Sequence, residues 1–577
     1  MNTRFNTMKS IVKKTALFIA IAAITACSQY ENKQKSDQRL VEEKVEFEST
    51  TELDQITVTG ANVLHVPKKT KNISKPIAHY AIADGLVAAS PMPAAYFSAE
   101  RNAENYQHFK DNRIKLTQNH PVSTFSIDVD TGAYSNMRRM LNNGLIPPKD
   151  AIRVEELINY FSYDYPNPTD NSQPFSISTE LAPSPWNSNA KLLHIGIQGY
   201  EIENQQRPAS NLTFLIDVSG SMNSANKLGL LKSSFKLLTK NLRKQDKVAI
   251  VVYAGAAGAV LDSTSGDKKS KILQALDKLN AGGSTNGAAG INLAYQITED
   301  NFIKGGINRV IIATDGDFNV GTTNFEQLKE LAERKRTTGI SLTTLGFGSG
   351  NYNDALMEQL ADAGNGNYAY IDTLKEANKV LVQEMSATLM TIAKDVKIQI
   401  EFNPNIVTQY RLIGYENRLL NNEDFNNDKI DAGEIGAGHS VTALYEIVLK
   451  GDKGWLEPLK YQNNKQKSSH SDEIATLKVR YKPVDEDTSK LLVKTLNTHQ
   501  LLDNIESTSH NFKLSAAVAA FGQLLRGGNM TQHFNYKDVQ NLARQTISDD
   551  NYGYRGEFLQ LVSLAESLTT QQANTVK

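Results

Sequence analysis

Hydrophobic residues in the middle of the chain come in short runs, and amphipathic stretches separate these runs. The runs lie at residues 214–216, 248–253, 310–313 and 340–347. Between the first two runs, apolar residues recur at the three- and four-residue steps of one helix face: Leu228, Leu231, Phe235, Leu238 and Leu242. Strands that alternate with helices predict an α/β fold with a doubly wound, mostly parallel sheet over residues 206–393.

The regions on either side, residues 116–205 and 394–577, alternate apolar and polar positions as strands with one buried face do. The alternating positions include Ile177, Leu181, Ile195 and Ile197 in the first region, and Ile398, Ile400, Ala443, Tyr445, Leu477 and Val479 in the second. Neither region has enough strands to bury two sheet faces, so we expect both to form one β-sandwich. From about residue 510 the pattern becomes helical, and it ends at Gly527 and Gly528.

The N-terminus has the pattern of a secretion signal. Lys9, Lys13 and Lys14 precede an apolar run at 16–24 that is too short to span a membrane. The segment Ile24-Thr-Ala-Cys27 resembles a bacterial lipobox, in which Cys27 becomes the lipidated first residue of the mature chain. We therefore expect residues 1–27 to be a lipoprotein signal peptide. An ordinary signal peptide with an incidental cysteine is the alternative.

The residues after Cys27 predict where the protein is held. Ser28 rather than Asp follows the cysteine, which resembles lipoproteins of the outer membrane. We expect a lipid-anchored protein of the cell envelope, at the periplasmic face of the outer membrane.

Residues 28–115 are polar and poorly periodic, which predicts a flexible tether. Cys27 is the only cysteine, so no disulfide can form within the chain.

The charges of the chain are balanced, with 62 basic and 63 acidic residues and a net charge of −1. The chain therefore lacks the excess of basic residues that is typical of nucleic-acid-binding proteins. A chain of 577 residues is long enough for roughly two to four domains.

Candidate metal ligands lie where the predicted strands end. Asp217, Ser219 and Ser221 follow the first strand at alternate positions, so all three can face one pocket. Thr285 lies in a Gly-rich loop, and Asp315 ends another strand within a Thr-Asp-Gly segment. In doubly wound sheets, ligands bind at the carboxyl ends of the strands. Ligands that are all oxygen suit Mg²⁺ or Mn²⁺.

This set of five residues resembles the metal-ion-dependent adhesion site of the von Willebrand factor type A (VWA) domain. The resemblance covers residues 208–390, and both flanking regions resemble those that accompany the domain in a family of bacterial VWA lipoproteins. The resemblance implies a metal with one open coordination position, which an acidic residue of a partner fills. The partner would be a protein or another macromolecule that presents a carboxylate. Neither its identity nor the oligomeric state follows from the sequence.

Two other functions use the same residues. Three of the five ligands are neutral hydroxyls, so the ion keeps much of its positive charge and could activate water in a hydrolase. We find no base to support this, since His194 and His439 are distant in sequence and no Gly-x-Ser-x-Gly or Walker motif occurs. The chain could also be an envelope scaffold with an unused metal site. We expect a binding protein and not an enzyme.

Asp424, Asn426 and Asp428 space their oxygens like a calcium-binding loop. Lys429 stands where such a loop has Gly, and Ile435 stands where it has Glu. We expect a solvated turn, with Ca²⁺ binding as the alternative.

Asp128 and Asp130 follow a predicted strand and could suggest the nucleophile pair of a phosphotransferase. That motif has Thr or Val at the position of Gly132. We expect a turn that leads into a capped helix.

Overall fold

The structure is a computed structural model, and it describes residues 103–168, 173–203, 205–284, 287–316, 325–457 and 470–575. Cys27, the rest of the predicted signal peptide and most of the predicted tether lie outside the described residues, as does Thr285. Within the described part of the chain, every helix is too short or too polar to cross a membrane.

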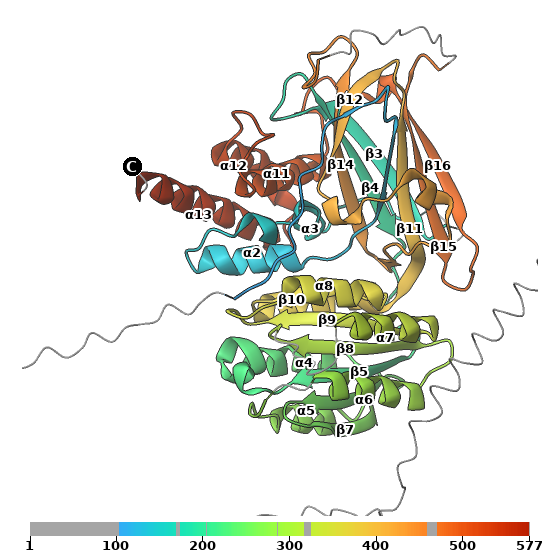
Figure 1. Cartoon of the computed structure of the whole chain (residues 1–577), viewed down its shortest axis with the longest axis vertical. Helices are drawn as coiled ribbons and strands as arrows, with labels where there is room; N and C mark the ends of the chain where they lie inside the picture. Colours follow the sequence, from blue (N-terminus) through green and yellow to red (C-terminus); the bar gives the residue numbers. More distant parts are fainter. Residues whose placement is uncertain are drawn as a thin grey trace, which may run out of the picture. The chain divides into compact units, whose positions relative to one another are not determined.

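The central domain is built on a six-stranded sheet with the order β10-β9-β8-β5-β6-β7 (Figure 1). The strands are β5 (Ser210–Asp217), β6 (Lys247–Tyr253), β7 (Ala257–Ser265), β8 (Ile307–Thr314), β9 (Ile340–Phe347) and β10 (Tyr368–Ile371). Neighbouring strands are parallel, except that β7 runs antiparallel to β6. The prediction of a doubly wound, mostly parallel sheet is confirmed.

Helices cover both faces of this sheet. They are α4 (Leu230–Lys240), α5 (Lys269–Asp277), α6 (Gly287–Asp300), α7 (Phe325–Thr337), α8 (Asp354–Ala363), α9 (Leu374–Asn378) and α10 (Met385–Leu389). Phe214 of β5 packs on one face, where its ring stacks on Phe235 of α4 at a centroid distance of 4.2 Å. Leu215 packs on the other face with Ile291 of α6. Strands buried on both faces explain the continuous hydrophobic runs of the sequence.

The two flanking regions form one β-sandwich, as predicted. One sheet has the order β1-β12-β14-β4-β3, and the other has β13-β11-β15-β16 with β2 also paired to β11. The strands before the central domain are β1 (Lys115–Leu116), β2 (Val122–Ser126), β3 (Phe175–Pro183) and β4 (Lys191–Gly199). The strands after it are β11 (Thr391–Phe402), β12 (Val407–Ile413), β13 (Ile435–Gly436), β14 (Ser440–Leu449), β15 (Glu473–Pro483) and β16 (Lys490–Asn497).

Strand pairs in both sheets join residues from before and after the central domain. Ile195 of β4 lies opposite Ala443 of β14, and Phe125 of β2 lies opposite Ile398 of β11. These residues belong to one hydrophobic core that both sheets share.

The helical tail packs against helices of the first flanking region. It comprises α11 (His510–Leu525), α12 (Tyr536–Arg544) and α13 (Tyr554–Thr575), and it packs on α2 (Gly132–Asn142) and α3 (Val154–Asn159) from the first flanking region (Figure 1). Met137 of α2 and Leu157 of α3 share a core with Phe521 and Phe558. The sequence predicted the tail helices but not this union, because the pattern of one helix does not say which distant helix covers its apolar face.

The predicted tether extends too far along the chain. The backbone N–H of Ala103 donates to the carbonyl of Gly350 over 2.8 Å, and that of Asn105 donates to Tyr352 over 2.9 Å. Lys115 and Leu116 then pair with β12. Residues 103–115 are polar in sequence, but backbone hydrogen bonds hold them against the folded chain, and such bonds leave no side-chain pattern.

Candidate metal centre

The topology of the central sheet brings two of the predicted ligands together. Asp217 ends β5, and Asp315 directly follows β8, which is the parallel neighbour of β5. The chain continues from β5 to β6 on one side, while β8 lies on the other side. The two carboxylates therefore lie at the topological switch point, where doubly wound sheets bind ligands. The side chains of both residues are fully buried.

Neutral donors orient the Asp217 carboxylate. Its Oδ1 accepts from the backbone N–H of Ser219 over 2.8 Å. Its Oδ2 accepts from the Thr314 hydroxyl over 3.0 Å and from the Tyr253 hydroxyl over 3.2 Å. Burial raises the pKa of the Asp217 carboxyl above its usual value, although the hydrogen bonds from Ser219 oppose this shift. A divalent cation at this carboxylate would favour its charged form.

The two serines lie side by side in the turn after β5. The Oγ atoms of Ser219 and Ser221 are 3.0 Å apart. Ser219 is buried and Ser221 is exposed, so the pair lies at the edge of the site that faces solvent. The loop that leads to Thr285 contacts the same turn, because the N–H of Gly220 donates to the carbonyl of Gly283 over 3.1 Å.

Lys227 is part of this site, although the sequence did not identify it. Its Nζ lies 2.8 Å from Asp315 Oδ2. Thr314 and Tyr253 were also missed as groups that orient Asp217. Thr314 could have been found, because it directly precedes Asp315 in the Thr-Asp-Gly segment. The sequence gives no signal for Tyr253 or Lys227, since a buried tyrosine and a lysine near a helix start are ordinary features.

These residues fit a hard divalent cation. The structure gathers Asp217, Ser219, Ser221 and Asp315 at one sheet edge, and all of their ligand atoms are oxygen, as Mg²⁺ and Mn²⁺ prefer. The Asp315 carboxylate contributes to the electrostatic raising of the pKa of Asp217, as two like charges at one site do. A buried carboxylate whose charged form is disfavoured by a neighbouring carboxylate is a setting in which a bound cation is favourable.

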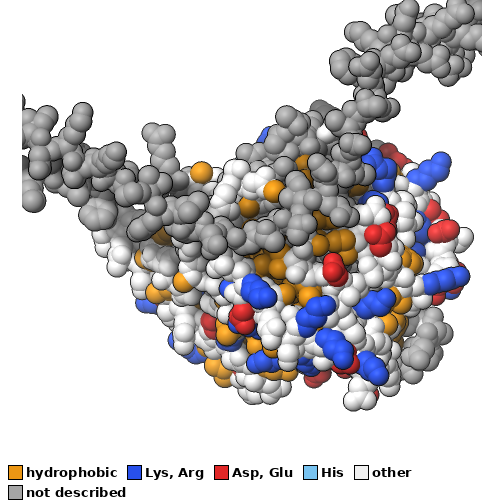
Figure 2. Space-filling model, turned by 90° about the horizontal axis from the view of Figure 1, so that it is seen from below, with side chains coloured by type: hydrophobic (Ala, Val, Ile, Leu, Met, Phe, Trp, Pro, Cys, Tyr) orange, Lys and Arg blue, Asp and Glu red, His pale blue; other side chains and the backbone are white. Residues whose placement is uncertain are grey.

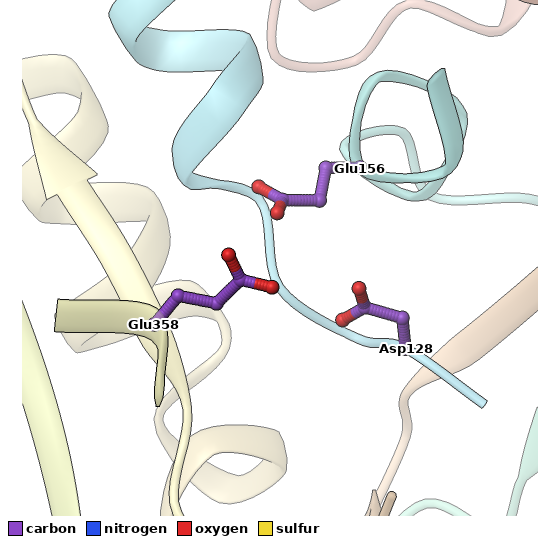
Figure 3. Close-up of side chains that lie close together, drawn as sticks. All are labelled: Asp128, Glu156 and Glu358. Atoms are coloured by element: carbon purple, nitrogen blue, oxygen red, sulfur yellow. The ribbon is translucent and has the colours of Figure 1, made fainter. Parts of the chain in front are cut away.

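A second group of carboxylates lies where the flanking regions meet the central domain. Asp128, Glu156 and Glu358 point toward one another, with ligand atoms within 4.8 Å of one another (Figure 3). All three side chains are buried, and burial raises the pKa values of Glu156 and Glu358. Asp128 precedes α2, Glu156 lies in α3 and Glu358 lies in α8.

Two arginines already contact this second group. Arg153 pairs with Glu156, and its Nη1 lies 3.6 Å from Glu358 Oε2. Arg418 Nε lies 3.1 Å from Asp128 Oδ2, and its Nη2 lies 3.3 Å from Glu358 Oε1. Guanidinium groups therefore pair with all three carboxylates, and the arrangement is a buried ion network that joins three parts of the chain.

The turn predicted at Asp128 is present, but its helix is capped differently. The N–H of Asp130 donates to Asp128 Oδ1 over 2.9 Å. Thr131, the residue before α2, makes no capping bond with its side chain. Glu156 from α3 accepts from the N–H of Ala133 over 2.7 Å instead, and it acts as a cap supplied by another helix.

The carboxylates of the acidic loop around residue 424 accept from different protein donors. Asp424 Oδ2 accepts from the N–H of Asn421 over 2.9 Å in a capping box. Asp428 Oδ1 accepts from Arg480 Nη2 over 3.0 Å. Each carboxylate has its own protein donor, as expected for a turn.

The two histidines weighed for catalysis belong to the sandwich. His194 lies in β4, where its Nε2 contacts the Tyr165 hydroxyl at 2.8 Å. His439 directly precedes β14. Burial lowers the pKa of His194 to about 3 and the pKa of His439 to about 4, so both are neutral at pH 7. Neither is on the edge of the central sheet that carries Asp217.

One face of the described residues shows mixed charge. On the face in Figure 2, Lys and Arg side chains are interspersed with Asp and Glu side chains. This agrees with the balanced composition.

Comparisons with known families match three consecutive parts of the chain. The profile described as von Willebrand factor matches residues 100–194, and that of the von Willebrand factor type A domain matches residues 211–384. The profile of the C-terminal region of the uncharacterized protein YfbK matches residues 387–568. The central domain, which is built on the six-stranded sheet, is therefore a VWA domain.

The chain is similar to an uncharacterized protein of Escherichia coli (strain K12), YfbK. The two are 48% identical over 479 residues, which is 82% of each chain. The human inter-alpha-trypsin inhibitor heavy chain H3 is 24% identical over 262 residues, a stretch that is 42% of this chain and 28% of that protein. A solved von Willebrand factor type A structure from Catenulispora acidiphila matches with a TM-score of 0.39 and 14% identity, covering 67% of this chain and 90% of that chain.

Proposed function

This chain belongs to the YfbK family and carries a VWA domain, and we propose that it binds an acidic group of a macromolecular partner through Mg²⁺ or Mn²⁺. The ligands would be Asp217, Ser219, Ser221, Thr285 and Asp315. The observation that carries the proposal is that Asp217 and Asp315 are both buried at neighbouring strand ends, next to the paired hydroxyls of Ser219 and Ser221.

The residues of the site favour binding of a carboxylate. Two of the described ligands are carboxylates and two are neutral hydroxyls, so the site carries no excess of negative charge over a divalent ion, and an anionic oxygen of a partner can take a remaining coordination position. Ser221 is exposed, and the open side of the site therefore faces solvent where a partner can approach. The donors from Tyr253, Thr314 and Ser219 fix the Asp217 carboxylate, which prepares it to hold a cation without rearrangement. A binding role needs nothing further from the chain, whereas hydrolysis needs a base.

The first experiment measures Mn²⁺ affinity by isothermal titration calorimetry. It compares the wild-type chain with Asp217→Asn, which keeps the size of the side chain but removes its charge. Asp262→Asn is the matched control, because Asp262 is an exposed residue of β7 in the same domain. We expect Asp217→Asn to weaken binding by roughly 100-fold or more and Asp262→Asn to leave it unchanged.

The second experiment captures partners from an envelope extract with Mg²⁺ or with a chelator. We expect capture by the wild-type chain with Mg²⁺, and none with the chelator or with Asp217→Asn. Full capture by a variant that no longer holds metal would reject the proposal in favour of a scaffold. Metal-dependent turnover of a substrate by the wild-type chain would favour a hydrolase instead.

We also propose that Cys27 anchors the chain to the periplasmic face of the outer membrane. The support is the lone cysteine directly after a short apolar run. A single acyl chain anchors only marginally, so retention requires several chains on the modified terminus. Cys27→Ser should abolish incorporation of labelled fatty acid and release the protein into the soluble fraction. Unchanged membrane fractionation of this variant would contradict the anchor.

A further inference from the structure

Lys227 reaches the metal centre from the turn that follows the serines. It lies in a single π-helical turn, Ala225–Gly229, directly before α4. Its Nζ is 2.8 Å from Asp315 Oδ2 and 3.3 Å from the side-chain oxygen of Asn351. The Lys227 side chain is only 10% exposed and that of Asp315 is fully buried, so the ion pair is shielded from water. π-turns of this kind are frequent at functional sites.

The backbone at Gly348 leaves the space in which the Lys227 side chain lies. Gly348 follows β9 with a φ of +77°, and a Cβ there would lie 2.4 Å from Lys227 Cε and 2.5 Å from its Cγ. The aliphatic stem of Lys227 therefore lies along the bare backbone of Gly348, and no other residue leaves this space. The ammonium is directed to Asp315 by packing along most of the side chain.

The charge of Lys227 opposes a divalent cation at this site. Without a metal, Asp217 and Asp315 are two buried carboxylates, and the ammonium neutralises one of them. A divalent cation that uses Asp315 must share this carboxylate with a positive charge held at hydrogen-bond distance. In a partly dehydrated site, like charges a few Å apart repel far more strongly than in water. The ion pair and the metal therefore compete for the same carboxylate.

We propose that Lys227 is a built-in competitor of the metal, which holds Asp315 when no metal is bound and sets the divalent-ion concentration at which the site fills. The proposal rests on the proposed function, since it concerns the same site. It predicts that removal of the ammonium strengthens metal binding, whereas removal of an ordinary supporting group weakens it. It also predicts that removal of the ammonium makes the metal-free protein less stable, because the buried Asp315 carboxylate loses the ammonium that pairs with it.

The test is Mn²⁺ titration calorimetry on the wild-type chain, Lys227→Met and Lys227→Gln. Methionine keeps the length of the stem, and glutamine keeps a donor for Asp315 without the charge. Lys232→Met is the control, because Lys232 lies in α4 and its Nζ donates to the carbonyls of Asp277 and Leu279, away from the site. We expect both Lys227 variants to bind Mn²⁺ at least roughly tenfold more tightly than the wild type. Lys232→Met should match the wild type.

A second readout is the melting temperature with and without Mn²⁺. Without metal, we expect Lys227→Met to melt at a lower temperature than the wild type. Saturating Mn²⁺ should raise the melting temperature of Lys227→Met by more than it raises that of the wild type. Equal or weaker Mn²⁺ binding by both folded Lys227 variants would overturn the inference.

The double variant Asp217→Asn/Lys227→Met separates the two proposals. If the higher Mn²⁺ affinity of Lys227→Met arises at this site, the double variant does not show it. If neither the wild type nor Lys227→Met binds Mn²⁺ in a way that depends on Asp217, the proposed function itself fails. If the wild type binds through Asp217 but Lys227→Met shows no gain, only the role of Lys227 fails.

Discussion

Arg153 donates from Nη2 to Asp354 Oδ1 over 3.2 Å, although 201 residues separate the two in sequence. A second bond runs from Nη1 to Oδ2 of the same carboxylate, and both side chains are buried. Asp354 is the first residue of α8. The loop before it packs on Gly316, where a Cβ would lie 2.4 Å from the N of Asn353. The bidentate pair therefore ties the first flanking region to a loop that touches the edge of the metal centre.

Loss of this arginine should destabilise the whole folded chain. Arg153→Met would leave Asp354 and Glu156 buried without their cation, which costs roughly 3–5 kcal/mol of unfolding free energy. Lys375→Met is the control, because Lys375 is 41% exposed and pairs with Glu557 at 3.8 Å; it should change stability by no more than about 0.5 kcal/mol. Urea unfolding followed by circular dichroism measures both. Equal stabilities of the two variants would show that the buried pair contributes no more than a surface pair.

The sequence predicted those parts of the protein that local patterns encode. Strand and helix periodicity gave the central sheet, and alternation gave the sandwich, because each element must turn one apolar face inward. Asp217, Ser219, Ser221 and Asp315 could be predicted as candidate ligands because their spacing follows the ends of strands. Lys227 could not, since only the π-turn and the bare backbone at Gly348 direct it inward.

The ion network could not be predicted for a similar reason. Arg153, Arg418 and their partners come from three regions far apart in sequence. Each lies in a stretch whose charged residues resemble those of any solvated helix or loop. Only the docking of the flanking regions on the VWA domain buries them, and docking has no signature in a single sequence.

The Tyr253 hydroxyl should support metal binding from behind the site. Tyr253→Phe removes one of the two hydroxyl donors to Asp217 Oδ2, so this carboxylate is held less firmly and Mn²⁺ affinity should fall by roughly tenfold. Tyr295→Phe is the matched control, because Tyr295 is a buried tyrosine of the same domain whose hydroxyl has no hydrogen-bond partner among the described residues. Titration calorimetry compares the two. A similar loss of affinity in both variants would point to a general packing effect.

A methyl group at Gly196 should disturb the sandwich. A Cβ there would lie 2.5 Å from Cζ of Tyr165, whose hydroxyl contacts His194 and the Thr442 hydroxyl at 2.8 Å and 2.7 Å. Gly196→Ala must displace this buried ring, at a cost of roughly 1–3 kcal/mol. Gly258→Ala in β7 has nothing within 4 Å of its Cβ and should be nearly neutral. Thermal melts of the two variants should differ; a Gly196→Ala variant as stable as Gly258→Ala would mean that the ring moves at no cost.

Glu434 should make the stability of the protein depend on pH. Its Oε1 accepts from Asn365 over 2.6 Å and its Oε2 from Thr391 over 2.9 Å. Burial raises the pKa of Glu434 to about 7, although Arg309 opposes this shift and Asp431 and Asp395 add to it. In the unfolded chain the pKa is about 4.5, so the folded chain binds more protons between these two values. The free energy of unfolding therefore falls as the pH rises from about 4.5 to 7.

Glu434→Gln removes this titration while it keeps an oxygen to accept from Asn365. Because the glutamine does not ionise, the variant should lose less stability than the wild type between pH 5 and 8, by roughly 1–3 kcal/mol. Urea unfolding at a series of pH values measures the difference, and each pH compares the two proteins directly. Other buried carboxyls such as Glu358 titrate in both proteins, so their contribution cancels. Parallel stability curves for the two proteins would show that Glu434 ionises at its ordinary pKa in the folded chain, with the burial of its carboxyl offset by the groups around it.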